Sequence, residues 1–407
     1  MAVLQNARLS DGRQVDLVVD GGHITAIHDA GEAPDADQAV DDLGGWLLLP
    51  AMAEPHAHLD KALTAEKVPN PTGDLLGAID AWISAAAAGM FTHEDTVERA
   101  AAAMELLLVH GVTLVRTHVN VMGDNQTKAL RAVVEAAERF EGLLDVQTVA
   151  LTSSPITGPE GAANRAALTA AIDEGVGYVG GCPHLDPDGP GLIRQAIEIA
   201  TDAGIGIDLH VDEMLDPNVL TLRDLARQVI DAGFEGPVAA SHCVTLGMQP
   251  PKVQAEVAGL VAEAGIAVFP LPQTNLFLQG RDQPTATPRG LTAVHALQDA
   301  GVLVGAGADN VQDPFNLVGR SDPLETAALM VMAGHQLPGD AYDMVSNNVR
   351  RALGHSPVQC AVGDVADLVA IDAPSVRGAI ADAPMSRKVY KGGRLVASAT
   401  QEVRVHR

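Results

Sequence analysis

The strongest constraint on the fold is a regular alternation of apolar runs with helical runs along most of the chain. Apolar runs typical of buried strands recur eight times, at residues 46–58, 112–121, 144–151, 176–184, 205–213, 237–246, 266–275 and 302–310. Stretches with helical periodicity, such as residues 93–111 and 191–204, separate several of them. Eight buried strands that alternate with helices predict an α/β fold, a (β/α)8 barrel of the TIM type.

The two ends of the chain have a different pattern. Residues 15–29 alternate apolar and polar positions around a Gly-Gly turn, and residues 363–398 repeat this style with a second Gly-Gly pair. Short strands joined by such turns predict β-structure at both ends. We expect residues 1–48 and 358–407 to combine into one small β-sandwich domain, and residues 49–357 to form the catalytic barrel.

Composition and charge disfavour several classes of function. The chain is 47% hydrophobic and 19% charged, as in soluble globular proteins. Its net charge of −26 would repel nucleic acid and anionic membranes, so neither is expected as a partner. Three scattered cysteines, Cys182, Cys243 and Cys360, form no CxxC pair and fit a reducing compartment. With no signal-like N-terminus and no apolar run of about 20 residues, we expect a cytoplasmic protein.

Histidines and acids stand at the ends of several predicted strands, where barrel enzymes carry their chemistry. In chain order these residues are His56, His58, His118, His210, Glu213, His242 and Asp309. His56 and His58 are two apart, so a strand presents both on one face. Imidazoles with one carboxylate suit Zn²⁺ or Fe²⁺, and the set His56, His58, His210 and Asp309 leaves a position open for water. The sequence therefore predicts a catalytic metal site.

The order of these motifs resembles the amidohydrolase superfamily, in particular its cytosine deaminase branch. The matching stretches are EPHAHLDK, VRTHVNV, HVDE, ASH, LQGR and GADNVQDPF. HLDK followed by an Asp-Asn pair is also similar to the N-isopropylammelide amidohydrolases, which remove N-alkyl groups from aminotriazine rings.

The resemblance implies roles for individual residues. One divalent ion, Zn²⁺ or Fe²⁺, would be held by His56, His58, His210 and Asp309, with Asp309 also accepting a proton. Glu213 would be the proton shuttle, and His242 would orient the metal-bound hydroxide that attacks a ring carbon and releases ammonia. Residues 176–186 contain no lysine that could form a bridging carbamate, which favours one metal over two.

The implied activity is hydrolytic deamination of a cyclic amidine or an aminated N-heterocycle, such as a cytosine-like pyrimidine. Ser153 stands near the point where the cytosine deaminase branch has a glutamine, and Asn310 replaces a frequent second aspartate. The alternative is therefore an amidohydrolase of N-substituted aminotriazines or cyclic amides. An inactive metal-binding sensor should lack the shuttle or a ligand, and this chain retains all of them.

Further residues are candidate contacts with a small N-heterocyclic substrate. They are Lys61, Ser153, His184, Asn275, Asn310 and Phe315. His184 is either such a contact or a structural histidine beside the site. The resemblance leaves a homo-oligomer open.

Overall fold

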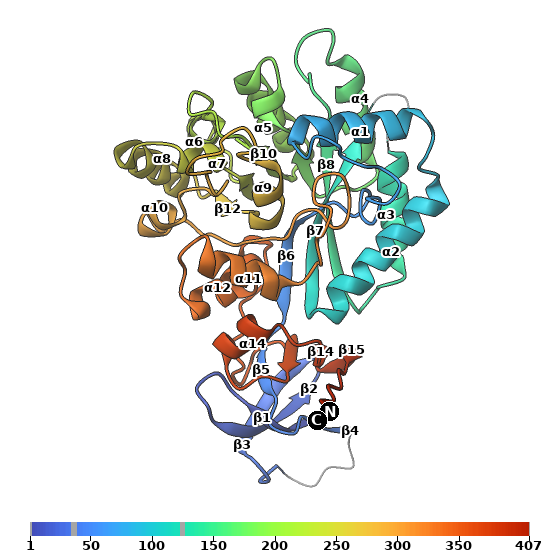
Figure 1. Ribbon diagram of the computed structural model, residues 1–407, viewed down its shortest axis with the longest axis vertical. Helices are drawn as coiled ribbons and strands as arrows, with labels where there is room; N and C mark the ends of the chain where they lie inside the picture. The colour runs from blue at the N-terminus through green and yellow to red at the C-terminus, as the bar shows by residue number, and fades with distance from the viewer. Residues whose placement is uncertain (1, 34–38, 123–126, 407) are drawn as a thin grey trace.

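A nearly closed barrel of parallel strands carries the fold in the computed structural model, which describes residues 2–33, 39–122 and 127–406 (Figure 1). Its sheet has the spatial order β12-β11-β10-β9-β8-β7-β6, and each neighbouring pair is parallel. The strands are β6 (Met52–Ala57), β7 (Val112–Val121), β8 (Asp145–Thr152), β9 (Tyr178–Gly180), β10 (Gly206–Val211), β11 (Val238–His242) and β12 (Ala267–Phe269). Sequential strands lie side by side, so the carboxyl ends of all seven point to the same rim.

The predicted eighth strand, residues 302–310, is not a regular strand. It closes the barrel through single bridges, from Val304 to Val268 of β12 and from Asp309 to Ala57 of β6. Asp309 has a φ of 66°, a left-handed conformation that does not continue a ladder. Two glycines, Gly305 and Gly307, further weaken this segment as a strand.

A buried carboxylate takes the place of part of the missing ladder. Glu54 of β6 accepts hydrogen bonds from the backbone N–H of His56 at 3.1 Å and of Ala308 at 2.9 Å. Its Oε1 lies so close to Gly307 that a Cβ there would approach within 2.3 Å. Only glycine fits at this point, and Glu54 thereby links β6 to the closing segment.

Helices connect the strands of the chain, and most of them cover the outside of the barrel (Figure 1). They are α1 (Leu75–Ala87), α2 (His93–Val109), α3 (Lys128–Glu138), α4 (Ala162–Asp173), η2 (Pro183–Leu185), α5 (Gly189–Ala203), α6 (Thr221–Ala232), α7 (Val244–Gly247), α8 (Pro251–Glu263), α9 (Pro272–Leu278), α10 (Val294–Asp299), α11 (Pro323–Met332), α12 (Pro338–Met344), α13 (Asn347–Ala352) and α14 (Val376–Asp382). In α2, Ala100, Met104 and Leu107 recur at helical spacing and are buried in the main core cluster. Within the described residues, none of these helices has the length and hydrophobicity that spanning a bilayer requires.

Strands from both ends of the chain form a second sheet, below the barrel in Figure 1. Its order is β15-β14-β13-β5-β1-β2-β3, with β4 paired to β1. The strands are β1 (Ala2–Arg8), β2 (Gln14–Asp20), β3 (His23–Asp29), β4 (Ala39–Asp42), β5 (Leu47–Pro50), β13 (Leu368–Ile371), β14 (Arg387–Lys391) and β15 (Arg394–Ala399). The predicted sandwich is not confirmed, because these strands share one continuous hydrogen-bonded sheet instead of two separate ones. The division into 1–48 plus 358–407 and 49–357 stays a prediction, and β5 lies across its first boundary.

Candidate active site

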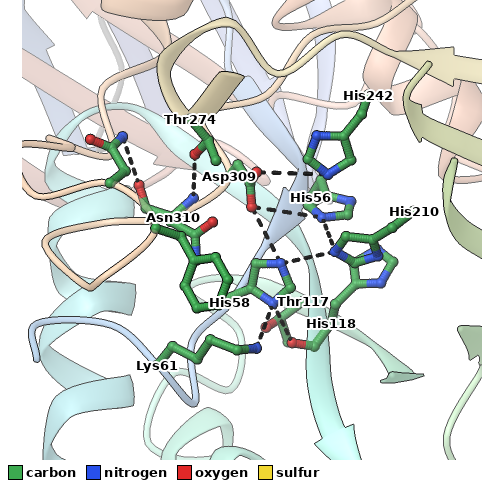
Figure 2. A network of polar contacts seen from close by, with 12 residues as sticks. His56, His58, Lys61, Thr117, His118, His210, His242, Thr274, Asp309 and Asn310 are labelled. Atoms are coloured by element: carbon green, nitrogen blue, oxygen red, sulfur yellow. Dashed lines mark hydrogen bonds and ion pairs between the residues drawn. The ribbon is translucent and has the colours of Figure 1, made fainter. Parts of the chain in front are cut away.

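Four predicted ligand atoms converge at the carboxyl rim of the barrel (Figure 2). His56 lies in β6, His58 directly follows that strand, His210 lies in β10, and Asp309 lies in the closing segment. Nε2 of His210 is 3.1 Å from Nε2 of His56 and 3.1 Å from Nε2 of His58. Oδ1 of Asp309 is 3.3 Å from Nε2 of His58 and 3.8 Å from Nε2 of His56. These four side chains therefore surround one small volume, and all are buried.

The donor set fits a divalent metal ion. Nε2 of His210 contacts the Nε2 atoms of both His56 and His58, but a single proton on it can serve only one of these contacts. Oδ1 of Asp309 accepts no hydrogen bond from any residue that the structure describes. Burial lowers the pKa of His56, His58 and His210 well below the usual value, with further lowering by neighbouring imidazoles or, at His58, by Lys61. These imidazoles are therefore neutral, which is the form that binds Zn²⁺ or Fe²⁺.

The surroundings orient the ring of His58. Its Nδ1 lies 3.1 Å from the backbone carbonyl oxygen of His118, so a proton on Nδ1 donates there. The lone pair of Nε2 then faces the cluster, as metal-binding histidines require. Nζ of Lys61 is also 3.1 Å from Nδ1, but it donates instead to Oδ1 of Asn120 in this tautomer.

His118 lies beside the cluster but is also held by a carboxylate. Two overlapping groups of described side chains have ligand atoms within 4.8 Å of one another, namely His56, His118 and His210, and His56, His242 and Asp309. Nε2 of His118 is 3.4 Å from Oδ1 of Asp208, and its ring centroid lies 3.9 Å from that of His56. His118 therefore supports the ring of His56, and it stays outside the four-atom set at the centre of the cluster.

Glu213 and His242 complete the polar side of the site. Nε2 of His242 lies 3.7 Å from Oε2 of Glu213 and 3.9 Å from Oδ2 of Asp309. Burial, followed by the charge of Asp309, raises the pKa of Glu213 well above its usual value. Burial lowers the pKa of His242 to about 4, and it raises the pKa of Asp309 to about 6. Burial thus favours the protonated form of Glu213 and the neutral form of His242.

A cavity of about 270 Å³ opens beside these groups. Its wall includes His58, His210, Glu213, His242 and Asp309. Four of the predicted substrate contacts also line it, namely Lys61, Ser153, Asn310 and Phe315. The structure thus brings the candidate metal ligands, the acid and most of the predicted contacts to one concave surface, which is the usual form of a small-molecule site.

Two predicted substrate contacts do not line this cavity. Asn275 is fully buried, and its Oδ1 lies 3.0 Å from Nδ1 of His242. It therefore holds the proton of His242 on Nδ1 and leaves Nε2 free on the cavity side. Nδ1 of His184 lies 3.2 Å from the carbonyl oxygen of His210, so this ring contacts the backbone of β10. Their placement supports positioning of His242 and His210 instead of contact with substrate.

Other cavity residues were not identified from the sequence. Helix α1 contributes four apolar side chains, Leu75, Ile79, Trp82 and Ile83, and β7 contributes Asn120. The α1 residues are spaced as one helical face, so the sequence does contain their pattern. An amphipathic pattern shows which face is apolar, but it does not show that this face borders a cavity.

Backbone conformation is unusual at the same rim. His242 and Asp309 have φ values of 67° and 66°, and Asp212, beside Glu213, has a φ of 50°. Residues other than glycine seldom adopt such conformations, which cost about 1–3 kcal/mol each and cluster at functional sites. This clustering supports a functional interpretation of the rim.

Known proteins share both the sequence and the fold. Residues 66–397 match the profile described as "Amidohydrolase family". A pterin deaminase from Rhizobium rhizogenes (strain K84 / ATCC BAA-868) is 34% identical over 94% of this chain and 88% of that protein. N-isopropylammelide isopropyl amidohydrolase from Pseudomonas sp. (strain ADP) is 27% identical over 97% of this chain and 96% of that protein.

A solved structure is similar over its whole length. The crystal structure of 5-methylcytosine deaminase from Klebsiella pneumoniae liganded with 5-fluorocytosine has a TM-score of 0.88 and 29% identity, and the match covers 99% of each chain. The family profile spans most of this chain, and the first of these relatives exceeds 30% identity along nearly all of it. This chain belongs to the amidohydrolase family.

Proposed function

We propose that this protein is a metal-dependent hydrolytic deaminase of a cyclic amidine or aminated N-heterocycle. The observation that carries the proposal is the convergence of the four ligand atoms of His56, His58, His210 and Asp309 on a cavity that also contains Glu213. Similarity to a pterin deaminase and to a 5-methylcytosine deaminase supports the same reaction class. The proposed cofactor is one divalent ion per chain, Zn²⁺ or Fe²⁺.

Each polar residue has a separate task in this proposal. A divalent ion in the cluster would supply a water molecule acidic enough to attack at neutral pH. The carboxylate of Asp309 would accept a proton from that water, and Nε2 of His242 would accept a hydrogen bond that holds it in line. Protonated Glu213 donates its proton to the ring nitrogen next to the attacked carbon. The water oxygen would become bonded to that carbon, and Asp309 would pass its proton to the exocyclic amino group. The exocyclic carbon–nitrogen bond then breaks, ammonia leaves, and the remaining hydroxyl proton returns to Glu213 as the carbonyl forms.

The proposed substrate is a cytosine-like pyrimidine or a related ring. Its polar edge would meet Lys61, Asn120, Ser153 and Asn310, which line the cavity. The amide nitrogen of Asn310 is already committed to Oδ2 of Asp313 at 2.8 Å, so its oxygen remains for the ligand. A glutamine amide binds a ring edge through two separate groups, its carbonyl oxygen as acceptor and its NH2 as donor. Ser153 has a single hydroxyl and cannot make that paired contact.

A second candidate is hydrolysis of an N-substituted aminotriazine or a cyclic amide. Similarity to N-isopropylammelide isopropyl amidohydrolase favours it, and so do the apolar α1 side chains beside the metal cluster. The same proton transfers would expel an alkylamine or open the ring.

The proposed location is the cytoplasm. All three cysteines, Cys182, Cys243 and Cys360, are free thiols, which suits a reducing compartment.

An ammonia-release screen tests the proposal. The panel comprises cytosine, isocytosine, creatinine, pterins, aminopurines and aminotriazines, each incubated with zinc-loaded, iron-loaded and metal-depleted protein, with mass spectrometry of the products. We expect ammonia and the corresponding oxo ring from the metal-loaded protein. Release of an alkylamine, or an opened ring, would favour the second candidate. Full activity of the metal-depleted protein would contradict both.

A further inference from the structure

Helix α1 forms one wall of the cavity that contains the metal cluster. Leu75, Ile79, Trp82 and Ile83 line the cavity together with His58 and Glu213. Figure 1 shows α1 at the end of the barrel, beside the label of β8. The apolar wall and the catalytic residues therefore belong to one compartment.

Part of this wall is left uncovered by the residues that the structure describes. Ile83 is 51% exposed, and Leu75 and Ile79 are only half-buried, although all three face the cavity. The apolar face of a surface helix normally packs against the core. Leu185, on the same cavity, is 36% exposed. An apolar group that entered the cavity would bury this surface.

The order of groups away from the metal cluster is also defined. Nζ of Lys61 lies 3.1 Å from Nδ1 of His58 and 5.8 Å from the centroid of the Trp82 ring. Lys61 therefore lies between the ring of His58 and the α1 wall. A reacting ring at the cluster would place its polar edge at Lys61 and any extension against α1.

The wall is anchored and therefore preformed. Trp82 stacks on Phe91 with ring centroids 4.3 Å apart. The carboxylate of Asp74 caps the helix by accepting a hydrogen bond from the N–H of Gly77 at 2.7 Å. A preformed apolar wall favours binding, because little conformational entropy is lost when a ligand packs against it.

We propose that Leu75, Ile79, Trp82 and Ile83 form an apolar subsite, and that the substrate is an aminated ring bearing an apolar substituent. This inference rests on the proposed function, since it places the reacting ring at the metal cluster. A substituent of several carbons extends from that ring to α1. The unsubstituted ring then binds through its polar edge and leaves the subsite empty.

Equilibrium binding to zinc-loaded Glu213→Gln protein tests the subsite without turnover. The probes are isocytosine against 6-propylisocytosine and pterin against 6-propylpterin. One methylene in a hydrophobic pocket changes selectivity by roughly 10–200-fold, so we expect at least one propyl ring to bind about tenfold more tightly than its parent. If no propyl derivative binds more tightly than its parent ring, the subsite proposal is wrong.

Neighbouring leucines on α1 provide a matched control. Leu75 lines the cavity, whereas Leu76 is 66% exposed and lies outside the cavity wall. In the Glu213→Gln background, Leu75→Ala and Ile79→Ala should each reduce the propyl preference several-fold, and Leu76→Ala should preserve it. Equal preference in all three variants would overturn the assignment of the wall. Ammonia release by the wild-type enzyme is scored separately: its absence contradicts the proposed function, whereas ammonia release without a propyl preference contradicts the subsite alone.

Discussion

At the scale of single residues, the proposed reaction depends on the proton that Glu213 carries. Burial and the charge of Asp309 hold its pKa well above the usual value, which favours the protonated form that can act as an acid. Glu213→Gln preserves the shape of the side chain but removes the transferable proton. We expect kcat to fall by about 10²–10⁴-fold, with the bound metal retained. Parallel measurement of kcat and metal content checks this, and loss of metal together with rate would mean that Glu213 is a ligand instead.

Glu54 is expected to act through its neighbours. Its carboxyl group links the backbone N–H groups of His56, a proposed metal ligand, and of Ala308, which precedes the proposed ligand Asp309. A glutamine has one acceptor oxygen, so Glu54→Gln leaves one of these N–H groups without its bond. Because groups that orient metal ligands contribute to affinity, we expect the metal affinity to fall by about 10–100-fold in a chelator competition. Glu66→Gln, at an exposed position, is the control and should match the wild type.

At this scale, the positions of the site residues were easier to predict from the sequence than the role of each residue. Histidines and acids at strand ends pointed to the cluster because a barrel brings those ends together. The tasks of Asn275 and His184 depend on which neighbour each side chain reaches, and this is decided by packing between distant segments. Glu54 was not singled out from the sequence, although it is an acid inside an apolar run; its two backbone partners appear only in the closed barrel.

At the scale of elements, a polar layer inside the barrel connects opposite strands. Arg116 of β7 donates to Oδ2 of Asp208 of β10 at 2.8 Å and to Oε1 of Gln147 of β8 at 2.8 Å. The side chains of Arg116 and Asp208 are 1% and 0% exposed. His118, two residues further along β7, contacts the other oxygen of Asp208, so this layer supports the candidate metal ligands.

Removing Arg116 leaves the buried charge of Asp208 without its main partner. We expect Arg116→Met to lower the free energy of unfolding by about 3–5 kcal/mol, measured by urea denaturation. Arg139→Met is the control, because Arg139 forms a surface pair with Glu98 and is 45% exposed. That change should stay within about 0.5 kcal/mol of the wild type. A similar small effect of Arg116→Met would show that the layer contributes little to stability.

Strands were predicted well where apolar periodicity continues and poorly where special backbone geometry interrupts it. The run 144–151 corresponds closely to β8, whereas the run 237–246 extends past the end of β11 at His242. Cys243, with a φ of 50°, turns the chain there although the side chains remain apolar. Hydropathy does not report φ, so the closing segment 302–310 was also predicted as a regular strand.

At the scale of the whole molecule, a buried ion pair joins the second sheet to helices that surround the barrel. Arg387 of β14 donates to both carboxylate oxygens of Asp322 at 2.8 and 2.7 Å, and to the carbonyl oxygen of His110 at 2.7 Å. Asp322 also caps α11. We expect Arg387→Ala to destabilise the protein by about 3–5 kcal/mol in urea denaturation. Arg404→Ala, which removes a pair that is 71% and 70% exposed, should have almost no effect.

Local turns were easier to predict than long-range pairing. Both Gly-Gly pairs join antiparallel strands, β2 to β3 and β14 to β15, and all four glycines have positive φ, as such tight turns require. The pairing of β5 with β13 joins segments more than 300 residues apart. No local pattern specifies that register, so the continuous order of this sheet could not be predicted from the sequence.

The central claim is that His56, His58, His210 and Asp309 hold one catalytic metal ion. The most direct measurement is elemental analysis of metal per chain after reconstitution and dialysis, for the wild type and for His56→Ala. We predict close to one equivalent of zinc or iron in the wild type and a large loss in the variant, with the fold retained by circular dichroism. A wild type without metal, or a His56→Ala variant with a full equivalent, would contradict the account.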